Sequence, residues 1–249
     1  MGRVLVTGGA KGMGAAIVRA LAEAGHDVTF TVRSSGAAAE ALVAEVKAAH
    51  PARDIVARAL DLADKQAVDA FVSELEQGET YYGLVHNAGQ PYDQLAAVMD
   101  QAKAEAVMQI NFFAFTRLVS ALIRPMMRAR TGRIVAIGSV TAERSNQGNA
   151  AYGASKAALA AYCRTLAIES AKRGVAVNVV APGFVDTDMM AKYADYRDKM
   201  ESQIPAGRFA KPEEIGGLVA YLLSPLAGYL TGATLTMDGG LTASMGLSR

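Results

Sequence analysis

Short apolar runs alternate with longer amphipathic stretches along the whole chain. Runs of four to seven mainly apolar residues, typical of buried parallel strands, occupy residues 3–7, 27–32, 54–60, 82–86, 133–138, 175–180 and 234–237. Apolar residues recur at helical spacing at residues 16–24, 37–49, 63–77 and 93–130. Two more helices are predicted, one that contains Tyr152 and Lys156 and ends near residue 172, and one that begins at residue 212. No linker, repeat or low-complexity segment interrupts this order. The pattern predicts a single α/β domain over residues 1–249, with a doubly wound parallel sheet of about seven strands and helices on both faces.

A glycine-rich turn joins the first predicted strand to the first predicted helix. Its spacing is Gly-x-x-x-Gly-x-Gly, one residue longer than the usual dinucleotide fingerprint. Glycines let the main chain approach a pyrophosphate, and the free N–H groups at a helix start can bind it. A simple tight turn would also use these glycines. The strand–turn–helix context favours a Rossmann-type dinucleotide site that includes Gly8, Lys11, Gly12, Met13 and Gly14.

The second predicted strand ends in cationic and polar residues. Chains that bind NAD place an acid here for the ribose 2′-hydroxyl, but this chain has Arg33 and Ser34. A guanidinium can bind a 2′-phosphate and stack on adenine, and Lys11 in the glycine turn adds a second positive charge. The sequence therefore predicts a preference for NADP(H).

A hydroxyl, a phenol and an ammonium are expected to converge after the fifth strand. Ser139 lies where that strand ends, and Tyr152 and Lys156 are four residues apart on the helix that follows. An ammonium beside a phenol stabilises the phenolate and lowers the pKa of the phenol from its usual ~10. Tyr152 would then act as general acid and base, and Ser139 would donate a hydrogen bond to a substrate oxygen. Taken alone, a Tyr–Lys pair at this spacing is common on helices and carries no function.

Composition and charge exclude several other classes of protein. The net charge is +1 over 249 residues, which gives no electrostatic case for nucleic acid or an anionic membrane. Cys163 is the one cysteine, in a helical pattern that predicts a small buried residue. The three histidines lack ligand-like spacing with acids or cysteine, so no metal site is expected. No signal peptide and no run of about 18 apolar residues is apparent, so we expect a cytoplasmic protein.

The segment that follows the sixth strand is polar and rich in Met and Tyr. Thr187–Gln203 does not fit the sheet pattern, and we expect it to form a mobile lid over the substrate site, spanning about residues 187–205. A pair of ordinary surface helices is the alternative. Asn111 is a second unusual feature, because an amide in an otherwise apolar helical turn needs hydrogen-bond partners.

These motifs together resemble the short-chain dehydrogenase/reductase family, over nearly the whole chain. The resemblance rests on the ordered set Thr7-Gly8-x-x-x-Gly12-x-Gly14, Asn87-Ala88-Gly89, Asn111, Ser139, Tyr152-x-x-x-Lys156, Pro182-Gly183 and Thr187. It implies that Tyr152 protonates a substrate carbonyl oxygen as NADPH delivers hydride to the carbon, while Ser139 holds that oxygen. It also implies that Lys156 binds the nicotinamide ribose and that Asn111 anchors a water of the proton relay. The remaining cofactor contacts that it implies are Asp61 and Leu62 at the adenine, Asn87, Ala88 and Gly89, Pro182 and Gly183, and Val185 and Thr187 at the carboxamide.

Within that family the chain is most similar to the 3-oxoacyl-(acyl carrier protein) reductases. The similarity is carried by residues 182–189, 204–209, 230–232 and 238–240. It implies reduction of a carrier-bound 3-oxoacyl thioester in fatty acid or polyketide-type synthesis, by a homotetramer joined through the long helices and the C-terminal strand region. Arg130 and Arg173 match positions that present positive charge to the acidic carrier protein, although solvated arginines at helix ends would look the same. The apolar tail 241–247 would fit burial at a subunit interface.

The chain departs from the family pattern around the expected substrate entrance. His86 stands where the family often has another Asn, Gln90-Pro91-Tyr92 is unusual, and the loop 141–149 carries Glu143 and Arg144. These changes do not affect the predicted catalytic residues. They leave undetermined which acyl chain the protein accepts. Two alternatives remain. One is a reductase of a sugar, cyclic ketone or other free carbonyl, and the other is a non-catalytic NADP(H)-binding scaffold, although no expected catalytic group is missing.

Overall fold

A computed structural model of the chain describes residues 2–34 and 36–243. Seven parallel strands form one sheet, in the order β3-β2-β1-β4-β5-β6-β7. The order reverses between β1 and β4, which are adjacent in the sheet but not consecutive along the chain. The strands are β1 Arg3–Thr7, β2 Asp27–Val32, β3 Ile55–Ala59, β4 Gly83–His86, β5 Gly132–Ile137, β6 Val175–Pro182 and β7 Thr234–Met237. The doubly wound sheet expected from the sequence is confirmed, with strand bounds that shift by two residues at most.

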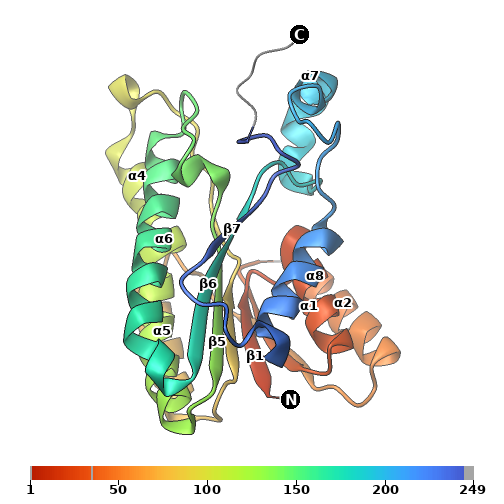
Figure 1. The fold of residues 1–249 in the computed structure, drawn as a ribbon, viewed down its shortest axis with the longest axis vertical. Coiled ribbons are helices and arrows are strands. Elements are labelled where there is room, and N and C mark those ends of the chain that lie inside the picture. Colours follow the sequence, from red (N-terminus) through yellow and green to blue (C-terminus); the bar gives the residue numbers. More distant parts are fainter. Residues whose placement is uncertain (1, 35, 244–249) are drawn as a thin grey trace.

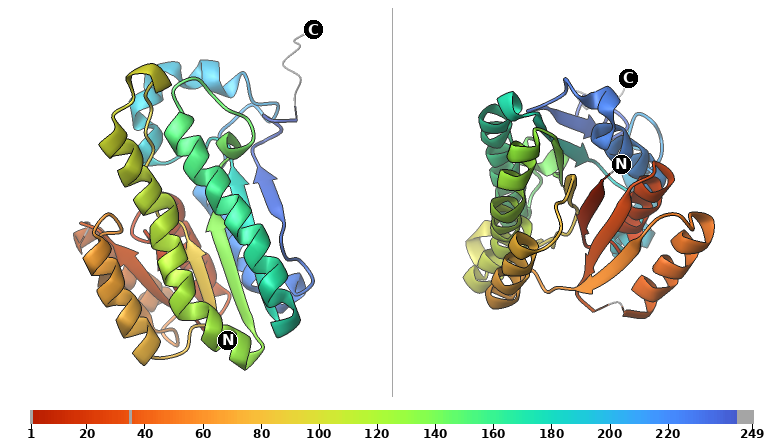
Figure 2. Two further views of the ribbon diagram at one scale, coloured as in Figure 1. Left: turned by 90° about the vertical axis from the view of Figure 1, so that its left-hand side faces the viewer. Right: turned by 90° about the horizontal axis from the view of Figure 1, so that it is seen from below.

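Helices cover both faces of the sheet, as Figures 1 and 2 show. One layer contains α1, α2 and α8, and the other contains α3, α4, α5 and α6. The helices are α1 Gly12–Glu23, α2 Gly36–Ala49, α3 Lys65–Gln77, α4 Gln101–Met108, α5 Ala114–Ala129, α6 Ala150–Ser170, α7 Arg197–Glu201 and α8 Pro212–Leu223. Short α7 lies apart from both layers, beyond the carboxyl ends of the strands (Figure 1).

The two faces of each central strand supply two separate cores. In β1, Leu5 packs into the core beneath α3, α5 and α6, whereas Val4 and Val6 pack into the core beneath α1 and α8. Successive side chains of a strand point to opposite faces, so a strand covered on both sides must be apolar throughout. This requirement explains why the central strands appear in the sequence as continuous apolar runs.

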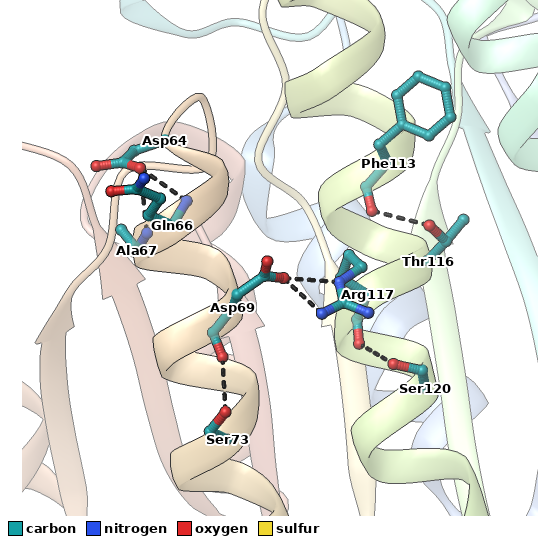
Figure 3. Close-up of polar contacts among 9 residues, drawn as sticks. All are labelled: Asp64, Gln66, Ala67, Asp69, Ser73, Phe113, Thr116, Arg117 and Ser120. Atoms are coloured by element: carbon teal, nitrogen blue, oxygen red, sulfur yellow. Dashed lines mark hydrogen bonds and ion pairs between the residues drawn. The ribbon is translucent and has the colours of Figure 1, made fainter.

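Polar contacts between neighbouring helices add to the apolar packing, as Figure 3 shows for α3 and α5. The Asp64 side chain begins α3 by accepting hydrogen bonds from the main-chain N–H groups of Gln66 and Ala67. Farther along α3, Asp69 accepts a hydrogen bond of 2.8 Å from Nε of Arg117 on α5. Both partners of this ion pair are about half exposed, so it fixes the pairing of the helices more than it stabilises the fold.

The predicted helix at residues 93–130 begins later than expected and is not uniform. α4 starts at Gln101, where the Asp100 carboxylate accepts a hydrogen bond from the Lys103 N–H. Residues 93–95 have no regular structure, and a single 3₁₀ turn follows at Ala96–Val98. Between α4 and α5 the chain forms a π-helical turn, Gln109–Phe113, which contains Asn111. Such turns widen a helix locally and are frequent at functional sites.

The helical run Gln101–Ala129 is long and apolar enough, by length and composition, to cross a membrane. It is not an unbroken apolar run, because charged residues such as Lys103, Glu105 and Arg117 interrupt it. Half of its most apolar window is buried inside the fold, and its buried side chains, such as Phe115 and Leu118, belong to the core beneath the sheet. A core helix of a globular domain has the same composition, because one of its faces must be apolar.

The segment after β6 consists of a 3₁₀ helix, Asp188–Tyr196, and α7. This part of the predicted lid covers the carboxyl end of the sheet and has no residue in the sheet. The predicted apolar tail begins within a turn at Leu241, and its residues 244–247 lie outside the described residues.

Candidate active site

A cavity of about 560 Å³ opens at the carboxyl ends of β1, β2, β3 and β4. It lies where the strand order reverses, the place where open α/β sheets bind ligands. Twelve residues predicted to bind the cofactor line it: Gly8, Lys11, Gly12, Met13, Gly14, Arg33, Asp61, Leu62, Asn87, Ala88, Gly89 and Thr187. Thr31, Leu60, Gln90, Pro91, Ile110, Asp188 and Met189 also line it and were not predicted. Ser34 follows Arg33 in an exposed position and does not belong to the lining.

The glycine turn has room for main chain only. Gly8 and Gly12 have φ angles of +67° and +51°, which glycine adopts without strain. A Cβ atom on Gly14 would lie 2.0 Å from the carbonyl oxygen of Gly8 and 2.7 Å from Nδ2 of Asn87. The start of α1 is therefore held directly against the end of β1, and its first residues line the cavity. This geometry suits a pyrophosphate.

Asn87 connects the glycine turn to the turn after β4. Its Nδ2 donates to the carbonyl oxygens of Thr7 at 3.2 Å and Gly8 at 2.9 Å. Its Oδ1 is buried and accepts no hydrogen bond from any described residue. A buried acceptor without a partner is costly unless a ligand supplies the donor. A sugar hydroxyl of a bound dinucleotide would satisfy Asn87, so the residues present fit such a cofactor.

Two cations and one carboxylate line the part of this cavity beside β2 and β3. In the part of the chain that the structure describes, neither Lys11 nor Arg33 takes part in an ion pair. Both are therefore available to an anionic ligand. Asp61 is engaged locally, because its Oδ1 accepts a hydrogen bond of 2.9 Å from the Ala63 N–H.

A second cavity, of about 400 Å³, continues from the first. The two cavities share four lining residues, Met13, Pro91, Thr187 and Met189. Ser139 and Tyr152 line the second cavity together with apolar side chains: Val140, Phe184, Met190, Met200 and Leu241. The predicted residues Pro182, Gly183 and Val185 lie here, rather than around the first cavity. A ligand that extends from the first cavity into the second would thus meet Ser139 and Tyr152.

Ser139 and Tyr152 line the same cavity, and the Ser139 hydroxyl is near enough to lower the pKa of the Tyr152 phenol. Ser139 follows β5, and its Oγ accepts hydrogen bonds from the N–H of Thr141 at 3.2 Å and from its hydroxyl at 2.9 Å. The Ser139 hydroxyl and the Tyr152 phenol thus place two O–H groups on the wall of the same cavity. Two such donors can hold one carbonyl oxygen between them.

The pKa of Tyr152 differs from the sequence-based expectation. Burial raises the pKa of the phenol, the Ser139 hydrogen bond lowers it, and the Asp93 carboxylate raises it, with a net shift above the ordinary value of 10.0. The prediction of a pKa lowered by Lys156 was wrong for this arrangement, because burial is the largest influence on the phenol and the Lys156 ammonium is not among the groups that shift its pKa. A raised pKa keeps the phenol protonated at neutral pH, as an acid that protonates a carbonyl oxygen requires.

Lys156 is fully buried one helical turn after Tyr152. Its Nζ donates a hydrogen bond of 2.7 Å to the carbonyl oxygen of Ile137 and lies 5.7 Å from the centre of the Tyr152 ring. Burial lowers its pKa to about 8, so it still carries its proton at neutral pH. The ammonium also lies next to Gly89, where a Cβ atom would be only 3.2 Å away. Lys156 therefore joins α6 to the turn after β4 that lines the first cavity.

Asn111 is completely buried, and its side chain is bonded within the protein. Oδ1 accepts a hydrogen bond from the Gln90 N–H at 2.8 Å, and Nδ2 donates to the Gln90 carbonyl at 3.2 Å and to Ser155 Oγ at 2.9 Å. Both amide protons are used, so only one lone pair of Oδ1 remains for the water that the resemblance implies. Ser155 in turn donates to the carbonyl of Tyr152 at 2.7 Å.

Sequence reasoning missed a polar cluster at the rim of the second cavity. The Asp93 carboxylate accepts hydrogen bonds from Asn149 Nδ2 at 2.6 Å and from the Tyr193 phenol at 3.0 Å. It thus joins the loop after β4, the start of α6 and the segment 188–196. Asn149 and Tyr193 lie 56 and 100 positions after Asp93, and no sequence pattern signals the pairing.

Arg130 and Arg173 lie at the amino ends of the strands, whereas this site lies at their carboxyl ends. Arg130 ends α5 in a left-handed conformation, with φ 53°, and its Nη2 donates to the Lys172 carbonyl at 3.3 Å. Both arginines precede the strands β5 and β6, whereas Ser139 follows β5. The six residues of β5 span about 20 Å at ~3.3 Å each. Within one chain the basic pair is therefore separated from Ser139 by the length of the sheet.

Comparison with known proteins agrees with this geometry. The family model described as enoyl-(acyl carrier protein) reductase matches residues 8–242. An acetoacetyl-CoA reductase of Synechocystis is 39% identical over 95% of this chain and 94% of its own length. A 3-oxoacyl-[acyl-carrier-protein] reductase of Vibrio cholerae is 37% identical over 95% of this chain and 96% of its own length. A solved structure of a putative NAD(P)-dependent gluconate 5-dehydrogenase from Beutenbergia cavernae, with bound NADP, superposes with a TM-score of 0.91 at 34% identity, covering 97% of each chain.

The chain belongs to the short-chain dehydrogenase/reductase family. The family resemblance read from the ordered motifs is therefore confirmed. The fold, with its seven parallel strands and two helical layers, is that of its structural relatives.

Proposed function

We propose that the protein reduces a 3-oxoacyl thioester to the 3-hydroxyacyl thioester with NADPH. The observation that carries this proposal is the convergence of the Ser139 and Tyr152 hydroxyls in a largely apolar cavity that continues from a dinucleotide-shaped one. Relatives named for this reaction, or for reduction of acetoacetyl-CoA, match nearly the full chain and support it.

Each residue of the site has a distinct task in this reaction. The dinucleotide, when bound, supplies the hydride that adds to the carbonyl carbon. Ser139 donates a hydrogen bond to the carbonyl oxygen, and Tyr152 gives that oxygen its proton as the C=O double bond becomes a C–O single bond. Lys156 holds positive charge beside the Tyr152 ring, which stabilises the phenolate left behind. Asn111 fixes the helix that carries both residues, and the phenolate regains a proton from solvent.

NADP(H) is the cofactor that the cationic lining favours. Arg33 and Lys11 reach the cavity without acidic partners among the described residues, and the end of β2 offers no carboxylate to a 2′-hydroxyl. The remaining predicted cofactor contacts belong to the same proposal. They are Asp61 and Leu62 at the adenine, Val185 and Thr187 at the nicotinamide carboxamide, and Asn87, Ala88, Gly89, Pro182 and Gly183 elsewhere along the cofactor.

The second candidate is reduction of another carbonyl by the same machinery. The relative named as a gluconate 5-dehydrogenase supports this alternative. Reduction of a carbon–carbon double bond, the reaction that the family model's description prints, suits the site less well. That reaction delivers the proton to carbon, whereas Ser139 and Tyr152 present two O–H donors to one oxygen.

A substrate panel tests the proposal. NADPH oxidation is followed with acetoacetyl-CoA, crotonyl-CoA, 5-ketogluconate and a cyclic ketone, while NADPH binding is measured separately by fluorescence. We expect acetoacetyl-CoA to be reduced with the highest kcat/KM. A higher kcat/KM for crotonyl-CoA or for a free ketone would contradict the thioester assignment and leave the cofactor assignment standing.

We also propose that an acyl carrier protein presents the substrate, with Arg130 and Arg173 as its contact. Because these arginines lie about 20 Å from Ser139 along the sheet, a carrier docked there would serve the site of a neighbouring copy in a homotetramer. We expect Arg130→Glu with Arg173→Glu to weaken reduction of carrier-bound substrate and to spare acetoacetyl-CoA. Unchanged kinetics with carrier-bound substrate would mean that the two arginines are ordinary solvated side chains.

The remaining assignments concern the whole molecule. We propose that residues 1–249 act as one domain in the cytoplasm and that the segment 187–205 moves as a lid over the second cavity. The Asp93 cluster supports the last point, because it ties the segment to the rim through an exposed hydrogen bond between the Tyr193 and Asp93 side chains.

A further inference from the structure

His86 is a fully buried ring at the centre of the molecule. It is the last residue of β4, beside Thr7 in β1 and Ala136 in β5, and it has no exposed surface. Its ring lies 5.0 Å from that of Phe115, centre to centre. The reaction described above gives His86 no task, and the family often has an asparagine at this position. A buried imidazole must nevertheless satisfy both of its nitrogens.

The neighbouring hydrogen bonds fix which nitrogen carries the proton. Thr7 Oγ1 accepts from the main-chain N–H groups of Asn87 at 3.1 Å and Ala88 at 3.0 Å. Its own proton is therefore free to point at His86 Nδ1, which is 3.1 Å away. Nδ1 is then the acceptor, and the proton of the neutral ring is on Nε2. Nε2 lies 3.3 Å from the main-chain carbonyl oxygen of Asn111 and donates to it.

The contact to Asn111 continues to the catalytic helix. The Asn111 side chain donates to Ser155, and Ser155 donates to the carbonyl of Tyr152. Two sets of hydrogen bonds therefore meet at Asn111: its main-chain carbonyl accepts from His86, which is bonded to Thr7 at the end of β1, and its side-chain amide donates to Ser155, the residue before Lys156. The His86 ring is neutral in this arrangement, because burial and the nearby Lys156 ammonium lower its pKa to about 3.

We infer that His86 is a positioning residue that holds the π-helical turn, and with it Asn111 and helix α6, in register with the cofactor turn. The predicted effect of His86 on the reaction rate rests on the reductase function proposed above. The predicted proton position and contacts of the ring rest on the hydrogen bonds alone. Small displacements of catalytic groups have large effects on rate, and ~1 Å can cost about 100-fold.

The structural part can be tested without any turnover. The ¹⁵N chemical shifts of the three histidine rings are recorded from pH 7 to pH 5, and the His86 signals are assigned by their loss in His86→Gln. We expect a neutral ring protonated on Nε2 throughout this range. A ring protonated on Nδ1, or one that becomes charged above pH 5, would overturn the inference whatever the substrate proves to be.

The kinetic part uses three variants. His86→Leu removes both hydrogen bonds at similar volume, and His86→Gln keeps an amide donor that can reach the Asn111 carbonyl. Phe115→Leu is the matched control, because it loosens the packing on the same ring and leaves the hydrogen bonds in place. For each variant, kcat with the best thioester, the NADPH dissociation constant from fluorescence, and Tm are measured.

We expect His86→Leu to lower kcat roughly 10- to 100-fold with the NADPH dissociation constant within about threefold of wild type. His86→Gln should recover most of that loss, and Phe115→Leu should lower Tm while kcat stays within about threefold. A kcat for His86→Leu near that of wild type would overturn the inference. So would losses of kcat that follow Tm across all three variants, since they would indicate a merely structural role. If wild type reduces no thioester, the proposed function fails, and the NMR result still decides the inference.

Discussion

The two cavities of the site are walled by different parts of the protein. The cofactor cavity is shaped by main chain: glycines, a helix start, and carbonyls that accept hydrogen bonds from the partly buried side chain of Asn87. The second cavity is shaped by side chains from a segment outside the sheet, with Met189, Met190 and Met200 as flexible fillers. The first wall tolerates no added atom at Gly14, whereas the second is linked to the fold largely through exposed polar contacts.

The two walls differ in how closely they can select a ligand. Main-chain groups can bind the part that all dinucleotides have in common, which is the pyrophosphate with its two riboses. A wall of methionines and surface loops adapts to the bound chain, so the acyl group is determined there. Four changes test this contrast, in order of decreasing effect.

The largest effect is expected from Gly14→Ala. The new methyl group would lie 2.0 Å from the Gly8 carbonyl oxygen, so α1 must move away from β1. We expect NADPH affinity to fall at least about 100-fold, equivalent to ~3 kcal/mol, together with a lower Tm. The control is Gly217→Ala in α8, where nothing lies within 4 Å of the added atom and a gain of about 1 kcal/mol is expected. Unchanged NADPH binding in Gly14→Ala would contradict the account of a rigid main-chain wall.

The next effect concerns cofactor choice. Arg33→Ala should raise the Michaelis constant for NADPH about 10- to 100-fold and leave that for NADH nearly unchanged, because only NADPH carries the 2′-phosphate. Arg19→Ala serves as control, since that arginine pairs with Glu45 and does not line the cavity. Equal effects on the two cofactors would remove Arg33 from the phosphate site.

His86 should make the native protein sensitive to acid. Its folded pKa of about 3 lies below the ordinary 6.5, so at pH values between these two the unfolded chain binds a proton that the native protein does not. Stability is therefore lost as the pH falls from 6.5 toward 3, by about 2 kcal/mol at pH 5. Urea unfolding at pH 7 and pH 5 should show a smaller loss for His86→Gln than for wild type. Equal losses would mean that the His86 ring is not kept neutral by burial. Burial also lowers the pKa of His26, but that residue is present in both proteins and contributes the same loss of stability to each.

The smallest effect is expected at the base of the lid. Arg197 binds Asp186 through two nitrogens at 2.9 and 3.0 Å, binds Glu201 at 2.8 Å, and stacks 4.7 Å above the ring of Phe209. The ion pair with Asp186 is exposed, so its loss changes the position of α7 only modestly. Arg197→Gln should raise the Michaelis constant of the thioester two- to fivefold and leave NADPH binding unchanged. A change in NADPH binding of similar size would mean that the two walls are not independent.

The same contrast explains what could be predicted from the sequence. The strands and the glycine turn were predictable because burial on both faces and close approach of main chain leave few residue types allowed. The start of α4 was misplaced, since Asp100 caps the helix after a stretch that has helical spacing but little regular structure. The hydrogen bonds of Asp93 join distant residues, and the direction of the Tyr152 pKa shift depends on burial. Neither is encoded in a local pattern.

Tyr152 provides the most direct test of the central claim, that the phenol delivers the proton. NADPH oxidation with acetoacetyl-CoA is measured for wild type beside Tyr152→Phe, with NADPH binding followed by fluorescence in both. The account predicts rapid oxidation by wild type, a loss of at least about 1,000-fold in kcat for Tyr152→Phe, and similar NADPH affinity in the two proteins. Comparable rates in wild type and Tyr152→Phe would contradict it.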